Sequence, residues 1–365
     1  MSRMIRISRF SFVAAIAALA SVAIACGASG TPAAGTGATP GASATKAPQP
    51  VTLHLGYFPN MTHAQPFAGL AKGFFAEALG PNVKIDSKTF NAGPAEIEAL
   101  FAGAIDIGYI GPNPSVTGYV QSQGKALRVI AGATGGGALL VVRADAGIAK
   151  PADLANKKIA TPQLGNTQDV ALRAFLQKNG LKDKDHGGNV QVIPTANADA
   201  LSLIQRGQLD GAWVPEPWAS RIILEANGKV LVDERDLWPN GDFVTTDVIV
   251  STKFLTEHPD VVEAFLKGHV KATQWINDNP DEAKQVVNAG IKQIIGAALS
   301  DNVINAAWRN QKITFDPLAS SLRKGADDAF ALGYLGDKKP DLAGIYALDP
   351  LNKVLKELNL KPVAP

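Results

Sequence analysis

From Val51 onward, short apolar runs alternate with segments whose apolar residues recur every three or four positions. Runs of four to eight mostly apolar residues indicate strands, and the longer period indicates amphipathic helices. The strands are predicted at 51–57, 83–90, 105–110, 127–131, 139–142, 158–160, 190–193, 209–214, 229–232 and 248–251. The helices between them are predicted at 64–79, 94–102, 114–123, 167–179, 198–206 and 216–226.

This alternation predicts the α/β class, with parallel sheets covered by helices on both faces. Two α/β blocks followed by a largely helical tail indicate a chain that leaves one lobe and later returns to it. The crossings are expected at the apolar strands 139–142 and 246–251, and two crossings make a hinge that can close on a ligand. The predicted organisation is a first part of lobe 1 at 51–140, lobe 2 at 141–246, and a return to lobe 1 with C-terminal helices at 247–365.

The first fifty residues have a different composition. Three arginines precede an apolar run at 10–25, which is too short for a membrane span of about twenty residues and typical of a signal peptide. The run ends in Ala-Ile-Ala-Cys-Gly at 23–27, which resembles the lipobox of bacterial lipoproteins, where the cysteine is lipidated and becomes the first residue. A plain secretory signal or an uncleaved anchor is the alternative. The prediction is a lipoprotein signal peptide at 1–25 and a disordered tether of Gly, Ala, Ser, Thr and Pro at 26–50.

Composition and charge narrow the classes of partner and chemistry. The formal net charge is +2, and removing the three leader arginines leaves −1 (+2 − 3), so nucleic acid is not expected as a partner. Cys26 is the only cysteine, which excludes an intrachain disulfide and a CxxC metal site. There is no GxSxG elbow, HExxH motif or P-loop, and the five histidines lack metal-ligand spacing. We therefore expect no enzyme activity, no metal and no cofactor; an α/β enzyme with His63 as its base is the alternative.

One predicted strand-to-helix loop, at 161–167, has the features of an anion-binding site. A short apolar strand runs into Gly165, then a cap-type residue, then a helix. Asn166 or Thr167 can cap that helix, with Asp169 reaching back toward the cap. The free backbone N–H groups of a helix N-terminus favour an anionic or strongly polar ligand. The alternative is a capped helix start without a ligand.

Ligands of open α/β sheets bind beyond the C-terminal ends of the strands, so the loops there are candidate site segments. Several of them place Gly or Asn just before a helix, although such turns are rich in these residues in any case. No arginine occurs in these loops, so a strong anion would rely on helix dipoles and amides. The candidate ligand-binding residues are Asn60, Thr62, His63, Asn91, Gly111, Asn113, Gly165, Asn166, Thr167, Gln168, Trp213, Glu216 and Trp218.

Trp213 and Trp218 bracket Glu216 in the loop after one predicted strand. Two tryptophans beside a cleft can pack the apolar part of a ligand, and core packing is the alternative for Trp213. A carboxylate beside an anionic ligand would be unfavourable. Glu216 is therefore expected to pair with a cation across the lobes, to cap the next helix, or to bind a cationic or hydroxyl group.

The segment 99–111, Ala-Leu-Phe-Ala-Gly-Ala-Ile-Asp-Ile-Gly-Tyr-Ile-Gly, resembles the AL-x-x-G-x-I-D-x-G stretch of the periplasmic binding proteins that serve sulfonate, taurine and nitrate importers. Segment 204–213 repeats this pattern in the second block, and 165–167 and 213–218 also match the family's usual positions. The resemblance covers about 51–335. It implies a type II periplasmic-binding-protein fold with two lobes, each a mixed sheet flanked by helices, and a two-strand hinge between them. It also implies a ligand in the cleft and delivery of that ligand to an ABC-transporter permease.

We therefore expect a monomeric solute-binding lipoprotein on the extracytoplasmic face of the cell membrane, anchored through a lipid on Cys26. The expected ligand is a small organic anion, an aliphatic sulfonate or a taurine-like compound. Members that resemble this chain also bind thiamine-precursor pyrimidines and riboflavin, so nitrate and a neutral or aromatic heterocycle are the alternatives. The ligand would settle on one lobe, and its higher affinity for the closed form would drive closure of the hinge.

Overall fold

Two β-sheets organise residues 50–365, the part of the chain that the computed structural model describes. The predicted signal peptide, Cys26 and the tether up to residue 49 lie outside the described residues. The strands of sheet A, in spatial order, are β11 (Gln311–Ile313), β4 (Leu127–Gly136), β10 (Val244–Ser251), β3 (Ile107–Ile110), β1 (Val51–Tyr57) and β2 (Val83–Thr89). Those of sheet B are β7 (Gln191–Pro194), β6 (Lys158–Thr161), β8 (Gly211–Pro215), β5 (Ala138–Arg143) and β9 (Gly228–Asp233).

Both sheets are mixed. In sheet A, β1 is parallel to β2 and β3, whereas β10 is antiparallel to β3 and β4. In sheet B, β6 is parallel to β7 and β8, whereas β5 is antiparallel to β8 and β9. The fold class implied by the family resemblance, two lobes that each hold a mixed sheet flanked by helices, is confirmed. The parallel sheets predicted from the alternation alone are wrong, because β10 and β5 run antiparallel to their neighbours.

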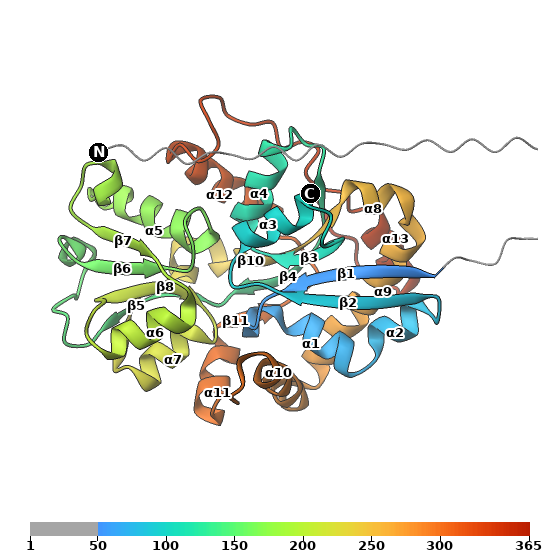
Figure 1. Cartoon of the computed structure of the whole chain (residues 1–365), viewed down its shortest axis with the longest axis horizontal. Helices are drawn as coiled ribbons and strands as arrows, with labels where there is room; N and C mark the ends of the chain where they lie inside the picture. Colours follow the sequence, from blue (N-terminus) through green and yellow to red (C-terminus); the bar gives the residue numbers. More distant parts are fainter. Residues whose placement is uncertain (1–49) are drawn as a thin grey trace, which may run out of the picture. The chain divides into compact units, whose positions relative to one another are not determined.

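Helices cover both faces of each sheet (Figure 1). On sheet B, α5 (Thr167–Lys178) packs on one face, and α6 (Asn197–Gln205) and α7 (Trp218–Glu225) pack on the other. One face of sheet A is covered by α3 (Gly93–Phe101), α4 (Pro112–Gln121) and α12 (Ala319–Ala331). The core on the other face of sheet A includes residues of α1 (Ala64–Ala71), α2 (Phe74–Leu79), α8 (Thr252–Glu257), α9 (Pro259–Asp278), α10 (Pro280–Ile295), α11 (Asp301–Arg309) and α13 (Asp349–Glu357).

The side chains of the central strands alternate between two cores, as the period of a strand requires. In β5, Leu139 and Val141 face the core beneath α6 and α7, while Leu140 and Val142 face the core beneath α5. In β10, Val248 and Ile249 likewise belong to different cores of sheet A. Continuous apolar runs at these strands therefore reflect burial on both faces.

The chain passes from sheet A to sheet B between β4 and β5. Gly136 and Gly137 have φ values of 70° and 77°, a conformation that glycine adopts without the steric penalty of a Cβ atom. The return runs through the short 3₁₀ helices η4 (Glu234–Leu237) and η5 (Pro239–Gly241) into β10. The half of the molecule built on each sheet is called the A half or the B half below.

Several element boundaries differ from the sequence pattern. The single helix expected at 64–79 is two helices, because Gly73 has a left-handed conformation (φ 76°) between α1 and α2. Strand β4 extends five residues beyond the expected 131, and β11 was not expected. Pro259 and Pro280 open α9 and α10, where proline is favoured because its missing N–H has no helical partner in any case. No helix within residues 50–365 combines the length and apolarity needed to cross a membrane.

Candidate functional site

A small cavity lies where the loops of the A half meet those of the B half. The volume of this cavity is about 30 Å³. Its lining comes from the segments that follow β1, β2 and β3 in sheet A and β6, β7 and β8 in sheet B. These are the carboxyl ends of the strands, where ligands of open α/β sheets bind.

Eight of the thirteen candidate residues line this cavity. Phe58, Pro162 and Pro215 contribute apolar contacts to the lining. The candidates that line the cavity are Asn60, Thr62, His63, Asn91, Gly111, Asn166, Thr167 and Gln168.

The start of α5 combines capping with exposure to the cavity. Asn166 is the N-cap, and its Oδ1 accepts a hydrogen bond from the N–H of Asp169 at 2.9 Å. The Asp169 carboxylate does not complete a capping box with Asn166; its Oδ2 accepts from the N–H of Gly165 at 3.0 Å. The Thr167 hydroxyl is buried without a partner. Capping by Asn166 is confirmed, and it leaves Thr167 free to contact a ligand.

The two tryptophans do not line the cavity. Trp213 is completely buried in the core of the B half, where its Nε1 donates to Glu234 Oε2 at 2.8 Å and its ring packs on Phe175. Trp218 Nε1 donates to Asn60 Oδ1 at 2.9 Å and thereby holds a cavity-lining residue of the A half from the B half. The geometry matches the core-packing alternative for Trp213. Trp218 does not line the cavity itself but holds Asn60, which does.

Glu216 also lies outside the lining, in the turn just before α7. Its carboxylate accepts from the N–H and the hydroxyl of Ser220 at 3.0 and 2.9 Å, and from Asn310 Nδ2 at 2.6 Å. Burial raises the pKa of Glu216 above its usual value. Of the three expectations for this residue, the geometry matches the one that it binds the start of the next helix.

The remaining two candidates hold neighbouring elements. Asn113 Nδ2 donates to the carbonyl oxygen of Gly325 at 3.0 Å and so joins α4 to α12. Gly165 has a φ of 74° and donates to Asp169. Neither lines the cavity, so their contact with a ligand stays a prediction.

No lysine, arginine, aspartate or glutamate is among the residues that line the cavity. His63 is buried, and burial lowers its pKa to about 3, so its ring is neutral at physiological pH. The N–H of Phe58 donates to His63 Nδ1 at 3.3 Å, which leaves the ring proton on Nε2. The cavity is therefore formed by neutral groups alone.

Four helix N-termini meet at the cavity. Gly93 begins α3, Gly111 is the N-cap of α4, Asn166 is the N-cap of α5, and Asn197 begins α6, and all four residues line the cavity. Each N-terminus has unpaired backbone N–H groups and a partial positive charge. Together they favour an anion without a cationic side chain.

Four buried side-chain atoms around the cavity have no hydrogen-bond partner in the protein. Buried polar groups are normally paired, so this cluster needs an explanation such as a ligand or ordered water. Two of the residues belong to the A half, one just before α1 and one in β10. The other two begin α5 and α6 in the B half. The atoms are Thr62 Oγ1, Thr246 Oγ1, Thr167 Oγ1 and Asn197 Oδ1.

Three polar residues that line the cavity were not predicted from the sequence: Asn197, Thr245 and Thr246. Asn197 follows β7, so the same strand-end argument could have found it. Thr245 and Thr246 lie at the beginning of a strand, where that argument finds nothing. Because β10 is antiparallel to β3, its beginning reaches the edge at which β3 ends. Only the strand order reveals this.

Within residues 50–365, no group of three or more His, Cys, Asp or Glu side chains is placed to hold a metal ion. The two halves approach each other closely at Gly111, where an added Cβ atom would lie 2.3 Å from Thr167 Oγ1. The start of α4 and the start of α5 therefore touch, so the two halves are closed on each other in this structure. A larger residue at position 111 would require the Thr167 side chain to rotate or the two helix starts to separate.

Known proteins resemble this chain in sequence and in fold. The model of the NMT1-like family matches residues 46–291. The taurine-binding periplasmic protein of Escherichia coli (strain K12) is 33% identical over 236 residues, which are 64% of this chain and 69% of that protein.

Two solved structures are similar in fold. The alkanesulfonate-binding protein from Xanthomonas axonopodis pv. citri, bound to MOPS, has a TM-score of 0.69 and 20% identity, over 83% of this chain and 100% of that chain. The periplasmic nitrate-binding protein from Synechocystis PCC 6803 has a TM-score of 0.73 and 17% identity, over 86% of this chain and 90% of that chain. At these identities the likeness concerns the fold.

Proposed function

Because this chain belongs to the NMT1-like family, we propose that it is an extracytoplasmic solute-binding protein that captures an aliphatic sulfonate and delivers it to an ABC-transporter permease. The observation behind this proposal is the neutral cavity between the two halves, at which four helix N-termini meet. Helix N-termini and hydroxyl donors suit the three oxygens of a sulfonate. The apolar side chains of Phe58, Pro162 and Pro215 suit its hydrocarbon part.

The absence of a carboxylate from the lining separates two kinds of sulfonate. Taurine has an ammonium group, and burying it without a partner of opposite charge is costly. Propane-1-sulfonate has a methyl group in the same place and needs no such partner. We therefore expect this protein to prefer propane-1-sulfonate over taurine, although a taurine-binding protein is among its relatives.

Isothermal titration of the purified protein with propane-1-sulfonate, taurine and nitrate tests the proposal. Propane-1-sulfonate should bind at least tenfold more tightly than taurine, since burial of an unpaired charge exceeds about 1.4 kcal/mol. If none of the three compounds binds, the assignment to a small anion is wrong. Tighter binding of taurine would show that a carboxylate reaches the ligand.

Nitrate is the second candidate. The space of about 30 Å³ suits a compact anion better than a long one, and a nitrate-binding protein shares the fold. Opening at the hinge enlarges such a cavity, so the volume of the closed form alone does not select nitrate. In the titration above, nitrate binding with no response to either sulfonate would favour this candidate.

The heterocycle and enzyme alternatives have less support. The heterocycle alternative relied on Trp213 and Trp218 to pack the apolar part of a ligand, and neither ring lines the cavity. A general base works best when its pKa is near the working pH, whereas burial lowers the pKa of His63 to about 3. His63 is therefore better suited to donate a hydrogen bond from Nε2 than to remove a proton.

We further infer that the mature protein is a monomer held at the extracytoplasmic face of the membrane by a lipid on Cys26. This inference rests on the sequence at 23–27 and on relatives that are periplasmic binding proteins. Metabolic labelling with an alkyne analogue of palmitate should label the wild-type protein and not the Cys26→Ala variant. Equal labelling of the two, or none, would contradict it.

A further inference from the structure

Asp169 lies directly behind the cavity-lining start of α5 and is completely buried. Its Oδ1 accepts a hydrogen bond from Thr161 Oγ1 at 2.9 Å, and its Oδ2 accepts one from the N–H of Gly165 at 3.0 Å. Its own N–H donates to Asn166 Oδ1 at 2.9 Å. These contacts fix both ends of the loop at 161–167. The position of Asp169 therefore determines the position of a loop that lines the cavity.

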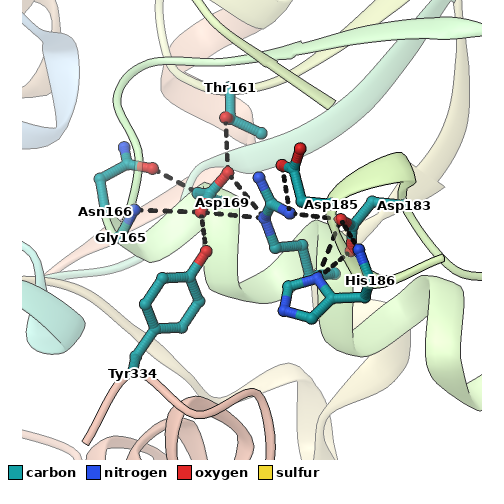
Figure 2. A network of polar contacts seen from close by, with 9 residues as sticks. Thr161, Gly165, Asn166, Asp169, Asp183, Asp185, His186 and Tyr334 are labelled. Carbon is teal, nitrogen blue, oxygen red and sulfur yellow. Dashed lines mark hydrogen bonds and ion pairs between the residues drawn. The ribbon is translucent and has the colours of Figure 1, made fainter. Parts of the chain in front are cut away.

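The charge of Asp169 is balanced within the B half. Arg173, also buried, places Nε 3.2 Å from both carboxylate oxygens of Asp169. The same guanidinium lies 2.7 Å from Asp183 and 3.3 Å from Asp185 (Figure 2). Asp169 thus has a cation and two neutral donors on its own half, and these suffice to keep a buried carboxylate in place.

A further donor to Asp169 comes from the other half. The hydroxyl of Tyr334 donates to Asp169 Oδ2 at 2.7 Å, although the two residues are 165 positions apart (Figure 2). Tyr334 follows α12, which is joined to sheet A where the N–H of Val244 donates to Ser321 Oγ at 2.9 Å. Burial and the neighbouring Asp169 raise the pKa of Tyr334, so its hydroxyl keeps its proton at physiological pH.

We propose that Tyr334 is a positioning residue for ligand capture, whose hydrogen bond to Asp169 fastens the start of α5 to the A half in the closed form and slows ligand release. The inference rests on the proposed function. Opening at the hinge moves α5 away from the A half and breaks this bond, and water then replaces Tyr334. A ligand between the halves and the Tyr334 hydroxyl therefore stabilise the same closed form.

Tyr334→Phe removes the hydroxyl and leaves Asp169 with Thr161, Gly165 and Arg173. We expect the dissociation rate of propane-1-sulfonate to rise about tenfold, as for loss of a hydrogen bond to a charged group, with little change in the association rate. Stopped-flow tryptophan fluorescence measures both rates. A merely structural role would not separate them in this way. Equal dissociation rates in the wild type and Tyr334→Phe overturn the proposal.

Tyr346→Phe is the matched control. The Tyr346 hydroxyl is buried and has no hydrogen-bond partner, so its removal should change neither rate. A similar acceleration in both variants would assign the effect to general loosening and would also overturn the proposal.

A wild-type protein that does not bind propane-1-sulfonate would contradict the proposed function, so a second measurement uses no ligand. In a chain with Cys26→Ser, the variants Lys84→Cys and Lys182→Cys place single thiols on exposed sites of the two halves for a pair of fluorescent dyes. Tyr334→Phe should lower the fraction of molecules with the short, closed dye distance, and Tyr346→Phe should not. An unchanged fraction in Tyr334→Phe overturns the inference.

Discussion

At the scale of single residues, the cavity is a set of neutral donors with few partners in the protein. Thr62, Thr167 and Thr246 each bury a hydroxyl that makes no hydrogen bond to another protein atom. A hydroxyl donates to an anion without adding charge, so such a site can bind a sulfonate and still exclude a cation. Specificity then depends on which groups remain unpaired when the wrong ligand is bound.

Replacement of Thr167 by valine keeps the shape of the side chain and removes one donor. We expect the affinity for propane-1-sulfonate to fall about tenfold, as for one hydrogen bond to a charged group. The free energy of unfolding without ligand should stay the same or rise slightly, because the hydroxyl that is lost has no protein partner. Titration calorimetry and urea unfolding measure the two effects.

Thr52→Val in β1 is the control, because Thr52 is exposed and does not line the cavity. Its affinity should equal that of the wild type. An unchanged affinity in Thr167→Val would remove Thr167 from the site.

Glu96 gives the protein a pH dependence that does not involve the ligand. Its carboxyl is completely buried without a hydrogen-bond partner, next to Gly56 and Gly108, where an added Cβ atom would lie 2.3 and 2.4 Å from Glu96 Oε1. Burial raises its pKa well above the usual value, so the native state keeps a proton that the unfolded chain loses above about pH 4.3. The free energy of unfolding therefore falls as the pH rises from this value toward the native pKa.

Glu96→Gln should weaken this dependence, because an amide has no proton to lose. We expect the variant to gain stability relative to the wild type between pH 5 and pH 8, by up to about 1.4 kcal/mol for each pH unit in which only the native state is protonated. Urea unfolding at several pH values measures it, and Glu98→Gln, exposed on the same helix, is the control. Parallel curves for the wild type and Glu96→Gln would show that Glu96 ionises in the native state.

Candidate residues could be found from the sequence where a local rule applies. The strand-end rule found Thr62, Asn166 and Thr167, and the pattern of a helix start found the cap at Asn166. The same rule found Glu216, yet its carboxylate bonds to Ser220 and Asn310 instead of facing the cavity. Which way a side chain points depends on partners far along the chain, and no local pattern contains that information.

At the scale of elements, the start of α4 in the A half meets the start of α5 in the B half. Gly111 caps α4 and lies against Thr167 at the start of α5. A helix N-terminus can approach an anion closely only if no side chain intervenes. The glycine therefore serves both the ligand and the closure of the two halves.

Gly111→Ala should hinder closure. Its Cβ atom would lie 2.3 Å from Thr167 Oγ1, so either the Thr167 hydroxyl would have to rotate away from its place at the cavity or the two helix starts would have to move apart. We expect the affinity for propane-1-sulfonate to fall at least tenfold, by an increased dissociation rate, with unfolding of the ligand-free protein little changed because the open form does not require this contact.

Gly325→Ala in α12 is the matched substitution, since its Cβ atom would meet Asn113 at an ordinary 3.5 Å. Alanine is favoured over glycine within a helix by about 0.5–1 kcal/mol, so this variant should be slightly more stable and bind normally. Normal binding by Gly111→Ala as well would mean that the ligand is held without the contact between α4 and α5.

The order of strands and helices was predictable because the apolar residues follow the strand period and the helix period clearly in this chain. Alternation of strands and helices gave the α/β class. The break at Gly73 was missed because its apolar neighbours continue the helical period across it. The order of strands in sheet A was not predictable, since β10 inserts between β3 and β4 after more than one hundred intervening residues.

At the scale of the whole described unit, several hydrogen bonds join the A half to the B half around the cavity. Those between side chains include Trp218 Nε1 to Asn60 Oδ1, Asn310 Nδ2 to Glu216 Oε1, and Tyr334 Oη to Asp169 Oδ2. Each links residues that are more than 90 positions apart. Such contacts depend on the closed arrangement of two separate sheets, which explains why the sequence alone did not reveal them.

The ligand and these contacts act on the same equilibrium between open and closed forms. A ligand shifts that equilibrium only as far as its affinities for the two forms differ. A sulfonate that meets helix N-termini from both halves has this property, because α3 and α4 belong to the A half and α5 and α6 to the B half. Capture and closure are then one process.

A crystal structure of the protein grown with propane-1-sulfonate tests the central claim most directly. We predict that the sulfonate lies between the two halves, with its oxygens within hydrogen-bond distance of Thr167 and of backbone N–H groups at the starts of α4 and α5. The Tyr334 hydroxyl should remain bonded to Asp169. A sulfonate found beside a lysine or arginine outside this cavity, with the cavity filled by water alone, would contradict the account.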